Sequence, residues 1–81
     1  MPPARFANLA RRRGLRLDPR TQILYDRHNL YVNGMAVALP RDAARLRRLA
    51  NERRLEGADV RGAAFVSLIH GWYEHGYIDF E

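Results

Sequence analysis

The three histidines of the chain, His28, His70 and His75, are the side chains best suited to titrate near neutral pH, to bind a metal ion or to transfer a proton. His70 and His75 are five positions apart, whereas a metal-binding pair on a helix needs a spacing of three or four. Glu74 has that spacing from His70, but one carboxylate and one imidazole leave a metal site underfilled. We therefore expect no metal centre and interpret the histidines as surface or boundary residues.

Carboxylates gather near the C-terminal end, at Glu74, Asp79 and Glu81. General acid–base chemistry needs two carboxylates held at a defined separation in a cleft, and a chain of 81 residues offers no evident cleft. The single serine, Ser67, lies inside an expected helix, where a nucleophile elbow does not form. The chain has no cysteine, which excludes disulfides and thiolate chemistry. We expect that the chain is not an enzyme and binds no cofactor.

Arginine is the most unusual part of the composition. All 14 cationic residues are arginine, and the formal net charge is +5. Residues 1–21 carry six arginines and one acid, residues 41–54 carry six arginines and two acids, and residues 55–81 carry one arginine and five acids. The chain therefore has basic parts at its front and middle and an acidic part at its end. A basic balance favours an acidic or nucleic-acid partner, but the absence of lysine is equally consistent with the codon bias of a GC-rich genome.

Two groups of arginines are candidates for contact with negative charge, one near the N-terminus and one on the solvent side of an expected helix. The alternative interpretation of both groups is an ordinary solvated face. The residues that we predict to make charge contacts are Arg11, Arg12, Arg13, Arg16, Arg45 and Arg48, and Arg41 would extend the same patch.

Aromatic side chains cluster near the C-terminus, at Trp72, Tyr73, Tyr77 and Phe80. Part of this cluster must close the core, but a domain this small does not have to cover all of it. We predict that Trp72, Tyr73 and Tyr77 form a surface for a protein partner, and burial in the core is the alternative.

The middle of the chain predicts a three-stranded antiparallel meander. Residues 21–25 and 30–32 are typical of strands, and Asn33-Gly34 is a strong signal for a tight hairpin turn, since both turn positions need positive φ. Residues 35–39 would form the third strand, which Pro40 would end because it cannot donate to a strand ladder.

Two main helices and a short strand are expected after the meander. The apolar spacing predicts helices over residues 42–54 and 59–75, with Asp59 as the N-cap of the second helix. Residues 77–80 alternate apolar and polar and predict a closing strand. The 47% hydrophobic content fits one small globular α+β domain over residues 15–81, preceded by a basic arm or short helix over residues 1–14.

One stretch, LYVNGMAVALPRDAARLRRLANER, resembles the front half of the OmpR-like winged-helix effector domain, in which a small antiparallel sheet precedes the helices. In that family a later polar, basic helix enters the major groove and a hairpin wing follows it. Here the last expected helix is apolar over about half its circumference, and the chain ends after one more strand. Both departures argue against DNA recognition by this helix.

A longer similarity is carried by RLDPRTQILYDRHNLYVNGMAVALP, the arginine-rich helix after it, and LIHGWYEHGYI. Together these stretches resemble the C-terminal winged-helix-like domain of bacterial ribosomal oxygenases, which are cupin-fold, JmjC-type arginine hydroxylases that use iron and 2-oxoglutarate. The resemblance covers roughly residues 15–80. In that family the iron ligands, a His-x-Asp pair and a distant histidine, lie in the preceding cupin domain. This sequence has no His-x-Asp, so the resemblance carries over no catalytic residue.

The resemblance implies a non-catalytic accessory domain that makes protein–protein or substrate contacts, with a cupin domain, a ribosomal protein or a second copy as the partner. A small nucleic-acid-binding winged-helix module is the alternative. No apolar run is long enough to span a membrane, and the start of the chain has no signal-peptide pattern. We therefore expect a cytoplasmic protein without membrane contact.

Overall fold

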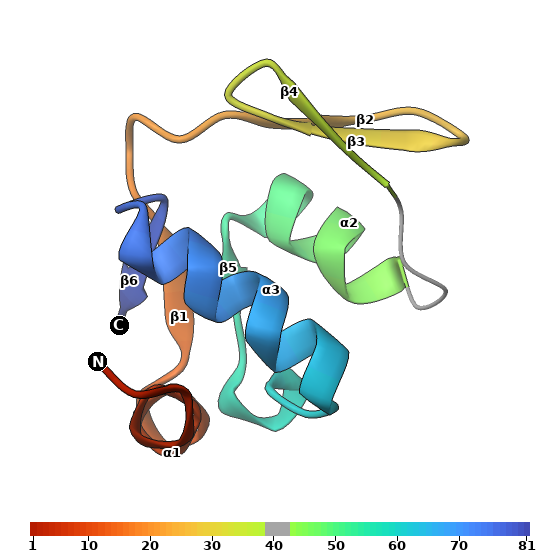
Figure 1. The fold of residues 1–81 in the computed structure, drawn as a ribbon. Coiled ribbons are helices and arrows are strands. Elements are labelled where there is room, and N and C mark those ends of the chain that lie inside the picture. The colour runs from red at the N-terminus through yellow and green to blue at the C-terminus, as the bar shows by residue number, and fades with distance from the viewer. Residues whose placement is uncertain (39–42) are drawn as a thin grey trace.

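The structure is a computed structural model that describes residues 1–38 and 43–81 (Figure 1). The elements in chain order are α1 (Pro3–Arg13), β1 (Leu15–Leu17), β2 (Ile23–Tyr25), β3 (Asn29–Val32), β4 (Met35–Ala38), α2 (Ala44–Glu52), β5 (Arg54–Leu55), the 3-10 turn η1 (Gly57–Asp59), α3 (Ala63–Glu74) and β6 (Ile78–Phe80). In Figure 1 the meander of β2, β3 and β4 forms the top layer, α2, α3 and the remaining strands lie below it, and α1 lies at the bottom.

The predicted meander is confirmed. β3 pairs antiparallel with β2 on one side and with β4 on the other. The Asn33-Gly34 turn has φ values of 50° and 84°, the positive values that this tight turn requires. The third strand is described as far as Ala38, so the predicted ending at Pro40 lies outside the described residues.

A second antiparallel sheet has the strand order β5-β1-β6. The closing strand predicted near the C-terminus is confirmed as β6, but its partner is β1, which the sequence analysis did not predict. Leu15 pairs with Leu55 on one side and Phe80 on the other, and its side chain is fully buried. Arg16 points to the opposite face and is exposed, as the period of two in a strand demands.

Residues 3–13 form the helix α1, so the N-terminal residues are a short helix and not an extended arm. Phe6 anchors this helix: its side chain is fully buried, and its ring centroid lies 5.2 Å from that of Tyr73 and 5.7 Å from that of Phe80. Gly14, with φ 78°, ends the helix. The division of the chain into two parts at residue 14 stays a prediction.

The two main helices are confirmed with shorter bounds than predicted. α2 ends at Glu52, and Arg53 follows in the left-handed conformation with φ 62°. The expectation that Asp59 caps α3 is wrong, because α3 begins at Ala63 and its N-cap is Gly62. Asp59 lies instead in η1, where its carboxylate accepts a hydrogen bond from the backbone N–H of Glu56.

Candidate interaction surface

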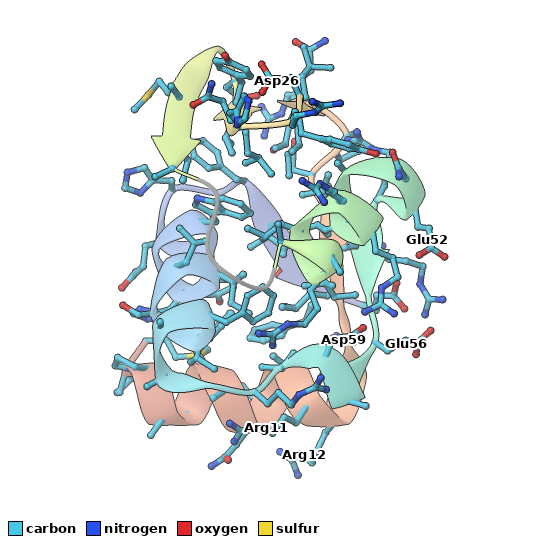
Figure 2. All side chains as sticks on the ribbon, turned by 90° about the vertical axis from the view of Figure 1, so that its right-hand side faces the viewer. Arg11, Arg12, Asp26, Glu52, Glu56 and Asp59 are labelled. Atoms are coloured by element: carbon cyan, nitrogen blue, oxygen red, sulfur yellow. The ribbon has the colours of Figure 1, made fainter. Side chains whose placement is uncertain are left out.

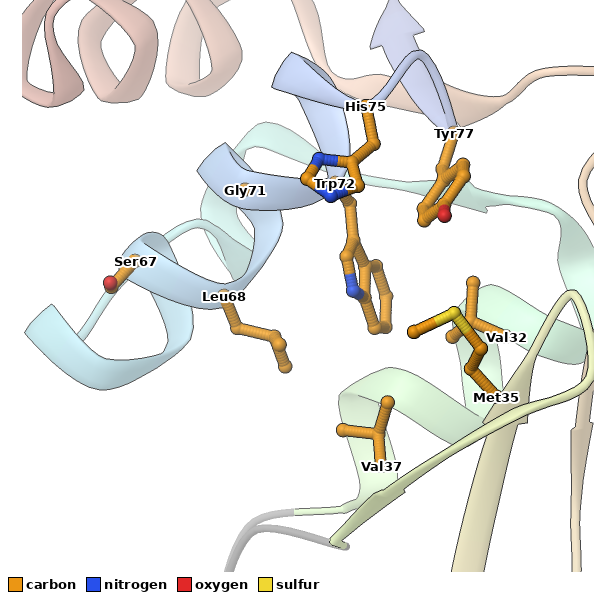
Figure 3. Close-up of a pocket in the computed structure, with 9 residues that line it drawn as sticks. All are labelled: Val32, Met35, Val37, Ser67, Leu68, Gly71, Trp72, His75 and Tyr77. Carbon is orange, nitrogen blue, oxygen red and sulfur yellow. The ribbon is translucent and has the colours of Figure 1, made fainter.

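An apolar hollow lies between the meander and α3 (Figure 3). Its volume is about 290 Å³, and its lining comes from β3, β4, α3 and the segment after α3. Of the described residues that line it, none carries a formal charge apart from a protonatable histidine. The lining residues are Val32, Met35, Val37, Ser67, Leu68, Gly71, Trp72, His75 and Tyr77.

The structure brings Trp72 and Tyr77 together at this hollow and separates Tyr73 from them. Trp72 is 6% exposed, and its indole extends toward Met35 (Figure 3). The ring of Tyr73 lies among aromatic rings of the core, 5.2 Å from Phe6 and 5.1 Å from Phe80 between ring centroids. Tyr73 is therefore part of the packing between α1, α3 and β6, and Trp72 and Tyr77 are the two aromatic residues that line the hollow.

The part of the hollow that the meander supplies was not predicted from the sequence. Met35 is 66% exposed, and Val37 is partly buried on the same face of β4. Two features of the sequence pointed to this part of the hollow. Alternate residues of a strand share a face, and the apolar face of the last helix is too wide to be covered by a single neighbouring element. These features could not be used without knowing that the hairpin folds over α3.

Two of the arginines predicted to make charge contacts, Arg45 and Arg48, hold η1 to α2 within the chain. The Nη2 atom of Arg48 lies 2.7 Å from Oδ1 of Asp59, which is a buried residue. Arg45 donates to the backbone carbonyls of Asp59 and Arg61, both at 2.8 Å, and its guanidinium lies 3.9 Å from the ring centroid of Phe65. Figure 2 shows Asp59 next to the 3-10 turn, beneath α2. We call Arg45, Arg48 and Asp59 the α2–η1 clasp.

Of the four N-terminal arginines predicted to make charge contacts, Arg11 and Arg13 donate hydrogen bonds within the chain. Besides the hydrogen bond from Arg54, the charge of Arg16 helps to lower the pKa of Glu81. Arg11 donates to the carbonyl of Val60 at 2.8 Å, and Arg13 donates to the carbonyl of Glu81 at 2.9 Å. Arg12 and Arg16 are exposed and make no hydrogen bond or ion pair with any residue that the structure describes. Figure 2 shows Arg11 and Arg12 on the lower side of α1. Arg41, which would extend the patch, lies outside the described residues.

The histidines lie apart from one another. Nε2 of His70 is 2.7 Å from the carbonyl oxygen of Met1 and 3.4 Å from the carboxylate of Glu74. His75 packs edge-on against Tyr77, with 5.4 Å between ring centroids. Among residues 1–38 and 43–81, no group of three or more histidine, aspartate or glutamate side chains is placed to hold a metal ion.

Three carboxylates outside the core have a lowered pKa. A hydrogen bond from the side chain of Arg20 is the main cause at Asp18, and a hydrogen bond from Arg54 is the main cause at Glu81. At Asp26 the main cause is hydrogen bonding from the backbone N–H groups of the tight turn that follows it. All three stabilise local turns or strand ends, and none of them lines the hollow.

In residues 1–38 and 43–81, three α-helices and two small antiparallel sheets define a small α+β domain. The family model described as "ROXA-like winged helix" matches residues 1–79, so the chain belongs to the ROXA-like winged-helix family. Neither a curated protein nor a solved structure matches the chain. In the part of the chain that the structure describes, no helix is long and apolar enough to cross a membrane.

Proposed function

We propose that this chain is a non-catalytic protein-contact domain of the ribosomal-oxygenase type, and that its partner is a cupin oxygenase domain. The observation that carries the proposal is the uncharged lining of the hollow between the meander and α3. An uncharged concave surface with two aromatic side chains suits an apolar anchor from another protein. The resemblance of residues 15–80 to the C-terminal domain of ribosomal oxygenases favours the cupin domain as the source of that anchor.

The positions of the arginines support a protein partner over a nucleic acid. Binding to nucleic acid depends on cationic side chains that can pair with phosphates. Arg48 already pairs with Asp59, and Arg11, Arg13 and Arg45 donate to backbone carbonyls of this chain. Within residues 1–38 and 43–81, no arginine lines the hollow. Among the described residues, the hollow and the available cations therefore do not coincide.

A binding experiment with a matched pair of variants tests the proposal. The chain is titrated against an isolated cupin oxygenase domain encoded in the same genome, with heat of binding as the readout. Leu68→Asp places a charge in the hollow, whereas Ala64→Asp places the same charge on an exposed position of α3 outside it. We expect binding by the wild type and by Ala64→Asp, and at least a tenfold loss for Leu68→Asp, which corresponds to about 1.4 kcal/mol.

Absence of binding by the wild type, or equal binding by both variants, would contradict the proposal. The nucleic-acid alternative makes the opposite prediction. It requires affinity for duplex DNA or RNA at about 50 mM salt that falls steeply as the salt concentration rises. Fluorescence anisotropy with labelled duplexes measures this directly, and we expect no such binding.

A further inference from the structure

Strand β4 is an edge of the meander whose outer side faces away from the rest of the sheet. Among the described residues, β4 pairs with β3 alone. Val32 and Met35 flank the two-residue turn, so they form the pair that exchanges hydrogen bonds, and the pattern then alternates along the hairpin. The backbone N–H and C=O groups of Ala36 and Ala38 consequently point away from β3, toward the open edge.

The side chains of β4 do not protect this edge. Natural edge strands are commonly guarded by charged residues or proline, and Met35–Ala38 contains neither. Met35 has the largest exposed fraction of the exposed large hydrophobic residues, 66%. Met35 and Val37 point to the face of the meander that borders the hollow, while Ala36 and Ala38 point to the opposite face. In Figure 2 the β4 arrow stands at the outer side of the meander.

We propose that β4 is a self-association edge, and that its occupant is β4 of a second copy of this chain. An antiparallel pairing centred on Val37 places Ala36 of each copy opposite Ala38 of the other. The outward N–H and C=O groups of these alanines then form four hydrogen bonds across a two-fold axis. The two Val37 side chains meet directly at the axis as a non-hydrogen-bonded pair. The result is a continuous six-stranded sheet.

A second copy fits this edge because its own β4 has the properties that the edge demands. The incoming strand needs small side chains opposite Ala36 and Ala38 and an apolar side chain opposite Val37, and Met35–Ala38 supplies both. The two-fold pairing also brings no arginine of one β4 against an arginine of the other, although each chain carries a net charge of +5. The backbone groups of Ala36 and Ala38 that pair in the dimer do not belong to the hollow, whereas the Val37 side chain borders both surfaces, so variants at Ala36 and Leu68 are the ones that separate the two proposals.

A charge-exchange experiment tests the two-fold register. Because Val37 meets its own symmetry mate, Val37→Glu and Val37→Lys each place like charges opposite one another, while a mixture of the two places opposite charges there. Sedimentation velocity over a range from micromolar to millimolar chain is the readout. We expect a reversible dimer for the wild type, at least tenfold weaker association for each variant alone, and a dimer in the equimolar mixture. A wild type that stays monomeric, or a mixture no more dimeric than either variant, would overturn the proposal.

A second pair of variants keeps the test valid if Val37 tolerates no charge. Ala36→Pro removes an outward N–H group that makes no bond to β3, so the hairpin is retained and the edge is blocked. Ala36→Thr keeps the N–H group and is the control. We expect a monomer for Ala36→Pro and a dimer for Ala36→Thr, and a dimeric Ala36→Pro would overturn the proposal. Ala36 does not line the hollow, so Ala36→Pro should still bind the cupin domain, and Leu68→Asp should still dimerise. The two proposals can thus fail separately.

Discussion

Removal of the Asp59 carboxylate should destabilise the domain strongly, because it breaks the α2–η1 clasp. Asp59→Ala loses the ion pair with Arg48 at 2.7 Å and the hydrogen bond from the Glu56 N–H at 3.2 Å. A hydrogen bond to a charged group contributes about 1.5–3 kcal/mol, and the side chain of Arg48 is 47% exposed, so solvent screening favours the lower value. A lost capping bond adds about 0.5–2 kcal/mol.

The expected total for Asp59→Ala is about 2–3 kcal/mol, a large part of the stability of a domain of this size. For a domain of 60–100 residues each kcal/mol lowers Tm by about 4–8 °C, so Tm should fall by about 10–20 °C. Circular dichroism during heating and urea titration measures both quantities. Glu52→Ala, which removes an exposed acid of α2, is the control and should change stability by less than about 0.5 kcal/mol.

A double-mutant cycle separates the Arg48–Asp59 interaction from the general cost of truncation. Arg48→Ala, Asp59→Ala and the double variant should give a coupling free energy of about 0.5–3 kcal/mol. If the coupling is near zero, or if Asp59→Ala behaves like Glu52→Ala, the clasp does not hold α2 to η1 and Arg48 is free to act as the charge-contact residue that the sequence first indicated.

Three further substitutions give simple outcomes. Gly57→Ala should cost about 1–3 kcal/mol, because a Cβ there would lie 2.0 Å from the carbonyl oxygen of Arg11; a Tm equal to that of the wild type would show that the turn can move aside. Gly71→Ala should instead raise stability by about 0.5–1 kcal/mol in urea titrations, since this position lies inside α3 with nothing within 4 Å of the added methyl group. The pKa of Asp26 is lowered in the folded state, so its stabilising effect is present above the ordinary carboxyl pKa and is lost as the pH falls through the folded value. Between pH 6 and pH 2.5 the Tm of Asp26→Asn should therefore fall less than that of the wild type, and parallel curves would contradict this assignment.

Local sequence signals predicted the parts of the fold that local interactions determine. The Asn33-Gly34 turn requires positive φ at both positions, which few other dipeptides tolerate, so the hairpin of β3 and β4 could be placed from two residues. The apolar spacing of Leu46 and Leu49 likewise predicted α2, and both side chains are fully buried. In each case the residues that carry the prediction lie within a few positions of one another in the sequence, so no knowledge of the tertiary structure was needed.

The features that were not predicted share one cause. Each of them depends on contacts between residues that are distant in the sequence. β1 has three residues and β5 has two, too few to show a period. They become strands because they pair with each other, and β6 pairs with β1 from more than 60 positions away. Asp59 has the residue type of an N-cap, but its carboxylate pairs with Arg48 of α2, which is distant in sequence. For the same reason only one side of the hollow was predicted. The wide apolar face of α3 indicated the contribution of that helix, whereas no local feature indicated the contribution of Met35.

Several arginines have a structural role that composition alone could not show. The chain has many short strands and turns, whose carbonyl groups lack the regular partners that long elements provide. Arginine side chains satisfy several of them: Nη1 of Arg45 donates to two carbonyls at 2.8 Å, and Nη2 of Arg53 donates to the carbonyls of Asp18 and Thr21 at 3.0 and 2.8 Å. A guanidinium presents five donors in a rigid plane, so it can join two loop carbonyls with little loss of entropy, whereas the ammonium of lysine is a mobile point charge. Much of the basic character of this domain therefore serves to hold its own loops together. A count of cationic residues in such a chain overstates the surface that is left for binding phosphate, and the location of each guanidinium has to be known before charge can be converted into a prediction of function.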